Sequence, residues 1–178
     1  EREAMDGATP TPLRWSLASA VVTEGRLSFT DRAMSLGHRI TAHLDRVEAG
    51  PISSMAGAPP SDVRLLAEIP GVAGRIVVDG TVDSVGPRFQ GSGEVKIEHL
   101  VPDELAPYLA LAGMAPAFDD GTFEVDKIDA DGLTFALRGL RVRDSGEELA
   151  AIDMARVAVG GEDRFEVEVS GARGRVRR

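Results

Sequence analysis

The sequence predicts a mainly β protein, built from one curled antiparallel sheet of about ten strands with one short helix. Three observations support this fold class. Apolar and polar residues alternate over most of the chain, Gly- or Pro-rich segments separate the alternating runs, and one run alone repeats at helical spacing. The apolar side of such a sheet needs a cover: a second sheet as in a β-sandwich, closure into a barrel, or a non-protein apolar ligand held in a groove.

Composition limits the partners of the chain. The 178 residues suffice for one domain or one segment of a longer protein, and 43% are hydrophobic. The 29 acidic and 20 basic residues give a net charge of −9, so we expect no nucleic-acid partner. Cysteine is absent, which excludes disulfides. No run approaches the roughly 18 apolar residues of a membrane span, so we expect membrane contact only through parts absent from this chain.

The first part of the chain predicts a hairpin. Residues 1–12 are a flexible, Pro-rich leader, and the segment LRWSLASAVV then begins the alternation. Glu24 and Gly25 are predicted to turn the chain into GRLSFTDR, because glycine suits the positive φ of a tight turn. This second strand is predicted to end at Asp31 and Arg32, since an Asp side chain accepts backbone hydrogen bonds at turns.

The middle of the chain combines strands with two irregular regions. The run HRITAHLDRV precedes a loop over residues 50–61 that is rich in Gly, Pro, Ser and Ala. The runs DVRLLAEI, GRIVVDGTV and RFQGSGEVKIEHL then predict three strands. One helix is predicted at about 102–112, because Pro102 suits a first helical turn and Leu105 and Leu109 lie one turn apart.

Four further strands are predicted from the runs GTFEVDKI, GLTFALRGLRVRD, ELAAIDMARVAV and RFEVEVSGARGRVRR. The last run stops in mid-alternation, without a turn or cap. We therefore interpret residues 1–178 as a single β-rich segment of a longer, repeat-containing protein.

No pattern typical of catalysis or metal binding stands out. His38, His43 and His99 form no pair at metal-ligand spacing, and Ser92 lies on the polar face of a strand and not at a nucleophile elbow. Residues 126–132, DKIDADG, resemble part of a calcium loop, but cations stand where its first and last acidic ligands are required, so a hairpin turn is the simpler interpretation. The segment FDDG is interpreted in the same way. We expect no enzyme, no metal site and no cofactor.

Several strand and turn patterns together resemble the repeated periplasmic segments of AsmA-like and TamB-like bacterial cell-envelope proteins. They are LRWSL, GRLSFTDR, GRIVVDGTV, LVPDELAPYLAL and GTFEV, and the closing runs ELAAIDMARVAV and RFEVEVSGARGRVRR are similar too. The resemblance covers roughly residues 13 to 177. It implies a taco-like β-groove, located in the periplasm of a Gram-negative-type bacterium, in a family associated with phospholipid transport between inner and outer membranes. Set against a whole member of that family, residues 1–178 are expected to correspond to a part without the N-terminal membrane anchor and without most of the repeats.

Two functions remain open at this point. The first is a groove that binds phospholipid acyl chains and pairs with neighbouring β segments of the same full-length protein. The second is a structural or assembly module with a dry protein core, which joins neighbouring repeats or outer-membrane clients through its strand edges. In the first case Gly91 and Gly93 leave room for an acyl chain or let the sheet bend. The candidate lining residues are Trp15, Leu17, Leu27, Phe29, Ile40, Leu44, Leu65, Ile76, Val95, Ile97, Phe123, Val125, Phe135 and Leu137.

Overall fold

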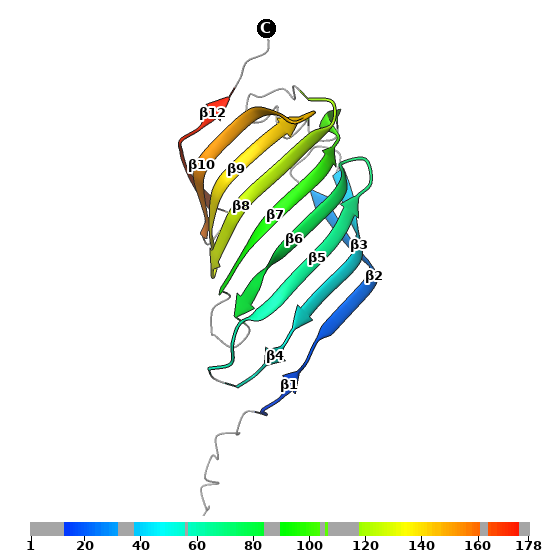
Figure 1. Ribbon diagram of the computed structural model, residues 1–178, viewed down its shortest axis with the longest axis vertical. Helices are drawn as coiled ribbons and strands as arrows, with labels where there is room; N and C mark the ends of the chain where they lie inside the picture. The colour runs from blue at the N-terminus through cyan, green and yellow to red at the C-terminus, as the bar shows by residue number, and fades with distance from the viewer. Residues whose placement is uncertain are drawn as a thin grey trace, which may run out of the picture.

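The computed structural model of the chain describes residues 13–31, 38–55, 57–83, 90–103, 106, 118–160 and 164–174 (Figure 1). Ten strands form one antiparallel sheet, and two short strands form a second. The large sheet contains β2 (Ala20–Asp31), β3 (His38–Gly50), β5 (Ser61–Ile69), β6 (Ala73–Asp83), β7 (Gln90–Leu100), β8 (Gly121–Asp131), β9 (Thr134–Asp144), β10 (Glu147–Gly160), β11 (Arg164–Ser170) and β12 (Arg173–Gly174). The small sheet pairs β1 (Ser16–Leu17) with β4 (Ile52–Ser53).

The large sheet is a meander, in which the strands follow one another in space almost as they do in sequence. Its order is β11-β10-β9-β8-β7-β6-β5-β3-β2, and β12 pairs with β10 beyond the end of β11. Short turns make the connections, for example Pro70 to Val72 between β5 and β6, where the Val72 amide donates to the Ile69 carbonyl. Gly132, with a φ of +61°, supplies the left-handed residue of the turn between β8 and β9.

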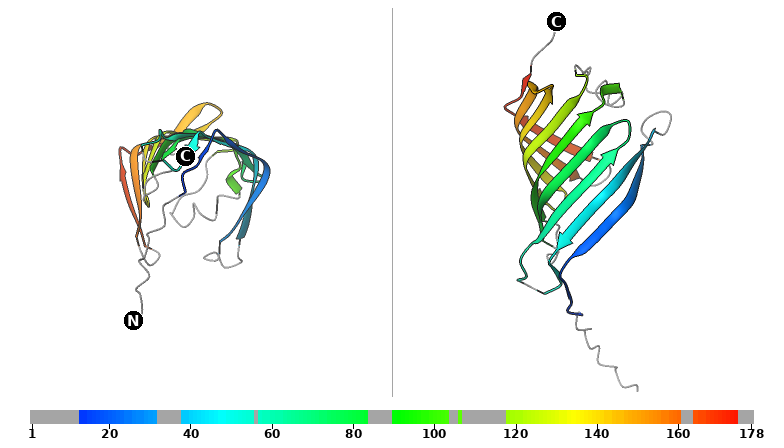
Figure 2. Two further views of the ribbon diagram at one scale, coloured as in Figure 1. Left: turned by 90° about the horizontal axis from the view of Figure 1, so that it is seen from below. Right: turned by 45° about the vertical axis from the view of Figure 1, so that its right-hand side comes forward.

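The sheet curls into an arch that stays open (Figure 2). In the view from below, β2 and β11 lie on opposite limbs, and neither pairs with the other. The predicted curled, antiparallel sheet of about ten strands is therefore confirmed. The structure has neither the β-sandwich alternative nor a closed barrel in the part that it describes.

Two local predictions have different outcomes. The predicted hairpin turn at Glu24 and Gly25 is wrong, because β2 continues through it and pairs with β3 on both sides. Glu24 has a left-handed φ of 58°, which kinks the strand. The kink shifts the alternation of apolar and polar residues by one position. A turn between two strands would leave the same shift in the sequence. The predicted turn at residues 126–132 is confirmed as the hairpin between β8 and β9. FDDG likewise precedes β8, which begins at Gly121.

The predicted helix at 102–112 and the predicted leader at 1–12 fall largely outside the described residues. Pro102, Asp103 and Ala106 are helical, and the rest of the predicted helix lies outside the described residues, as does the whole leader. The predicted loop at 50–61 contains β4, and Ser61 closes its base by donating a hydrogen bond of 2.7 Å to the Pro51 carbonyl.

The strand register divides the large sheet into two chemically different faces, because residues opposite each other on neighbouring strands point to the same side. We call one of them the apolar face. Its members include Val22, Gly25, Leu27, Phe29, Ile40, Ala42, Leu44, Val47, Val63, Leu65, Ala67, Ile76, Val78, Gly80, Val82, Gly91, Gly93, Val95, Ile97, Phe123, Val125, Ile128, Ala130, Phe135, Leu137, Leu140, Val142, Ile152, Ala155, Val157, Val167 and Val169. The other, which we call the charged face, carries most of the ion pairs.

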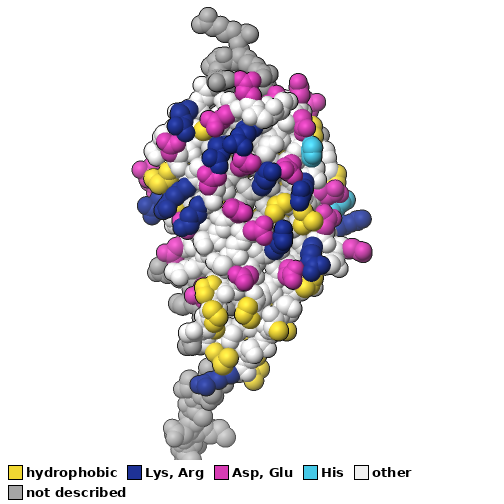
Figure 3. Space-filling model, in the orientation of Figure 1, with side chains coloured by type: hydrophobic (Ala, Val, Ile, Leu, Met, Phe, Trp, Pro, Cys, Tyr) yellow, Lys and Arg dark blue, Asp and Glu magenta, His cyan; other side chains and the backbone are white. Residues whose placement is uncertain are grey.

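The charged face is the convex side of the arch. Figure 3 shows it in the orientation of Figure 1, with Lys, Arg, Asp and Glu side chains spread over the middle strands. The apolar face therefore lines the concave side, which opens downward in the left view of Figure 2.

Candidate functional site

The concave side carries a continuous apolar surface that runs across every long strand from β2 to β11. Adjacent members lie opposite each other from strand to strand, as in Phe29 with Ile40, Ile76 with Ile97, and Ile97 with Phe123. The concave side is the candidate site, because a sheet face of this size and composition needs an apolar partner.

The described residues provide little cover for this surface. Few apolar side chains are buried, and none of the large ones is fully so; the buried ones are Ala67, Ala73, Leu100, Val125, Ala151 and Ala155. Toward the edges the apolar face is open to solvent, since Leu27 is 63% exposed and Val167 is 61% exposed. The extensive contacts between described strands all join hydrogen-bonded neighbours. Within the described chain, the two limbs of the arch do not pack on each other as the faces of a sandwich do.

The register places most of the predicted lining residues on this face. They run from Leu27 and Phe29 on β2 to Phe135 and Leu137 on β9. Trp15 and Leu17 differ, because they lie before the large sheet, next to and on β1. The lining also includes residues that sequence reasoning missed, among them Val78, Ile128 and Leu140. The alternation of apolar and polar residues within each run could have identified them. Kinks within the strands shift this alternation by one residue, so the sequence alone does not show which residues share a face.

A notch formed by glycines lies in the middle of the apolar face. Gly80 on β6 is opposite Gly93 on β7, and Gly91 is opposite Ala130 on β8. We call this hollow of about 180 Å³ the glycine notch, and only apolar surface lines it. The surrounding apolar side chains are Val63, Val78, Val82, Ile128, Ala130 and Phe135.

Glycine is required where β6 and β7 approach each other. A Cβ at Gly80 would collide with the Ser92 carbonyl, and one at Gly93 would meet the Asp79 carbonyl. The two backbones thus lie closer than side chains allow, and the same absence of side chains leaves the hollow above them.

The convex side carries ion pairs both between neighbouring strands and within a strand. Glu124 accepts a hydrogen bond of 2.9 Å from Arg143, and Asp129 lies 2.9 Å from the Lys127 ammonium and 3.7 Å from the Arg138 guanidinium. These pairs are at least partly exposed, so each contributes at most about 1 kcal/mol to folding. Their larger effect is to keep this face hydrated, in contrast to the apolar concave side.

Glu98 is the acid whose titration this network changes. The pKa of Glu98 is lowered, first because Lys96 donates a hydrogen bond to it at 2.7 Å, and also because Arg75 lies 3.3 Å away; partial burial opposes the change.

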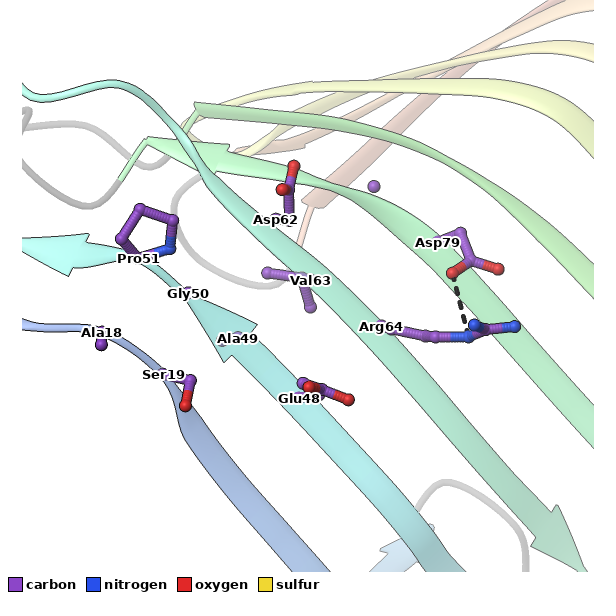
Figure 4. A pocket seen from close by; sticks show the side chains of 11 residues that line it. Ala18, Ser19, Glu48, Ala49, Gly50, Pro51, Asp62, Val63, Arg64 and Asp79 are labelled. Atoms are coloured by element: carbon purple, nitrogen blue, oxygen red, sulfur yellow. Dashed lines mark ion pairs between the residues drawn. The ribbon is translucent and has the colours of Figure 1, made fainter.

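A further hollow lies on the charged face and has a mixed polar and apolar lining (Figure 4). It measures about 510 Å³, and Glu48, Asp62 and Asp79 line it together with Arg64, whose Nε lies 3.3 Å from an Asp79 oxygen. No histidine is among its lining residues.

The described histidine side chains each contact a different carboxylate and do not form a shared site. His43 Nδ1 lies 3.1 Å from Glu68, and His99 Nδ1 lies 3.1 Å from Asp120 at one end of the sheet. No group of three or more His, Cys, Asp or Glu suited to a metal ion occurs among the described residues. None of the helical residues described here belongs to a helix that is long and apolar enough to cross a membrane.

Comparison of the chain with protein-family models, with curated proteins and with solved structures finds no match.

Proposed function

We propose that this chain is a groove segment of an AsmA-like envelope protein, and that its concave side binds the acyl chains of phospholipids during their transport between inner and outer membranes. One observation carries the proposal: a continuous apolar surface lines an open arch, and the described residues add no second layer over it. The resemblance of the strand and turn patterns to that family supports the choice of lipid as the partner.

The chemistry of the surface suits a ligand that slides as well as binds. Burial of each CH₂ group contributes about 0.8 kcal/mol, so a long acyl chain gains affinity without any specific polar contact. Aliphatic side chains dominate the lining, and the glycine notch has no polar surface. Such a lining offers many similar positions along the groove and few deep traps.

The proposed setting is the periplasm of a Gram-negative-type bacterium, in a longer protein. Neighbouring β segments would then pair with β2 or with β11 and β12, which are the outer strands of the sheet. We propose no reaction for the chain, because the residues that line the concave side provide only shape and apolar contact.

A second function, that of an assembly module, is favoured by the same outer strands. β2 is a long strand of 12 residues with neighbours on one side only in the sheet. A long outer strand is a template for pairing with another chain, whatever the concave side binds.

The test uses the purified chain and a pair of matched variants. Native mass spectrometry with lipid extraction reports bound phospholipid, and calorimetric titration with monomeric lysophosphatidylcholine reports affinity. Leu27→Asp places a charge on the open part of the apolar face, whereas Ser28→Asp places the same charge on the other face of β2. We expect Leu27→Asp to weaken binding about tenfold, by loss of apolar contact and burial of a charge, and Ser28→Asp to leave it unchanged.

The proposal fails if the folded wild-type chain carries no lipid and gives no binding heat. Lipid-free oligomers that grow with concentration would favour the assembly module.

A further inference from the structure

The chain has a second apolar surface, separate from the concave side. It lies where β1 and β4 pair, beyond one end of the large sheet and on its long axis (Figure 1). We call it the apolar tip and define it by Leu13, Trp15, Leu17, Ile52, Met55 and Pro59. In Figure 3 hydrophobic side chains gather at this end, whereas charged side chains cover the middle of the same view.

The large side chains of the tip are exposed to solvent. Leu13 is 83% exposed, Trp15 49%, Leu17 45% and Met55 47%. A hollow of about 340 Å³ lies at the same end of the chain, and Ser16, Ile52, Met55 and Pro59 are among its lining residues. Exposed Trp, Leu and Met side chains grouped in this way mark a surface that binds a partner.

The charge of the tip differs from that of the rest of the chain. Residues 13–19 and 51–60 contain no Asp or Glu, although the chain has 29 acidic residues, and their single cation is Arg14. An acid-free apolar surface with one arginine beside it suits a phospholipid bilayer, whose anionic head groups attract Arg and repel carboxylates.

The backbone holds the single tryptophan of the chain in place. Ser54 Oγ accepts a hydrogen bond of 2.9 Å from the Trp15 amide, and the Ser54 amide donates one of 3.0 Å to the Trp15 carbonyl. Ser54 Oγ also donates toward the Leu13 carbonyl at 3.3 Å. Trp is enriched at membrane–water interfaces, because its ring is apolar and its N–H is polar.

We propose that the apolar tip inserts into the interface of a phospholipid bilayer and places one end of the concave side at the membrane surface. The inference rests on the proposed function, since a lipid groove must meet a membrane to load or unload. β1 leads into β2, whose Ala20 and Val22 both belong to the apolar face, so the two apolar surfaces adjoin. The described chain itself then contacts the bilayer, a role that the sequence-based expectation gave to other parts of a longer protein.

The experiment uses Trp15 as the reporter, because it is the only tryptophan in the chain. The full chain is mixed with vesicles of phosphatidylcholine and phosphatidylglycerol, and sedimentation is measured together with Trp emission and its quenching by brominated acyl chains. We expect wild type to sediment with vesicles, its emission to shift to shorter wavelength, and the brominated lipids to quench it.

Two variants locate the contact. Leu13→Glu combined with Met55→Glu adds acids at exposed positions of the tip and should lower vesicle partitioning by about tenfold or more. Val101→Glu makes the same kind of change at an exposed position beyond the end of β7 and should leave partitioning unchanged.

The outcomes separate this inference from the proposed function. Binding of monomeric lysophosphatidylcholine without any vesicle-induced change at Trp15 overturns the tip inference and leaves the groove standing. A Trp15 shift with vesicles, in a chain that binds no monomeric lipid, supports the tip and removes the groove. Sedimentation that needs no vesicles but depends on the tip would assign this surface to a second copy of the chain and overturn the inference.

Discussion

Filling the glycine notch should weaken acyl-chain binding by an amount that its volume sets. Ala130 lies at the notch opposite Gly91, so Ala130→Trp projects a large side chain into the hollow without straining a glycine position. A methylene group occupies about the volume of a water molecule, about 30 Å³, so the notch of about 180 Å³ holds about six methylenes of an acyl chain. If the indole displaces about half of six methylenes, at about 0.8 kcal/mol each, the loss is about 2.4 kcal/mol, or about 60-fold in Kd.

The assay is calorimetric titration of each purified variant with monomeric lysophosphatidylcholine. Ala136→Trp is the matched control, because Ala136 lies on the charged face of β9, opposite Asp129 and Arg156. Thermal melts establish that both variants are folded. An Ala130→Trp protein that binds as tightly as wild type and as Ala136→Trp would refute the assignment of the notch, and with it the argument that the hollow holds part of the ligand.

Two further predictions concern stability. Gly139 has a φ of +62° and a Cβ there would collide with the Asp126 carboxylate, so Gly139→Ala should cost about 1–3 kcal/mol in urea unfolding, from left-handed backbone strain plus loss of the Asp126–Arg141 pair. In an Asp126→Ala background the same substitution should cost less, and an equal cost in both would contradict the collision. Because the pKa of Glu98 is lowered on folding, its contribution to stability is present above the ordinary pKa of a Glu carboxyl and is lost as pH falls through the lower folded pKa. The difference in melting temperature between wild type and Glu98→Gln should therefore shrink between pH 7 and pH 3, and a difference that stays constant would count against this cause.

The alternation of apolar and polar residues was enough to predict the sheet and many of the residues that share its apolar face. In RFQGSGEVKI every second residue is apolar or glycine, and β7 indeed places Val95 and Ile97 on the apolar face. The turn chemistry of Asp131 and Gly132 was equally clear, because a two-residue loop that needs positive φ has few solutions.

The sequence was misleading where a strand changes phase without ending. Glu24 in β2 and Gly139 in β9 both have positive φ within a continuous strand, so residues three apart share a face there. In the sequence, such a kink looks the same as a turn, and only the pairing with a neighbouring strand distinguishes them. The small β1–β4 sheet was missed for another reason, since two-residue strands are too short to show a period.

Partner identity depends on information that alternation does not contain. A face covered by protein and a face covered by lipid have the same pattern, and the openness of the arch follows from how far each strand twists and bends. Trp15 and Leu17 illustrate the limit, because their alternation fits a groove lining whereas their place is beside β4 at the tip.

The contacts between adjacent strands in the large sheet determine how the chain unfolds. Because the extensive contacts between described strands join adjacent strands only, no distant layer ties the outer strands to the central ones. Stability is then close to a sum of local terms, as in solenoid proteins, and unfolding can begin at either edge and stop part of the way. Amide hydrogen exchange should be fastest in β2 and β11 and slowest around β7, and losing or gaining a terminal hairpin would leave the centre of the sheet unchanged.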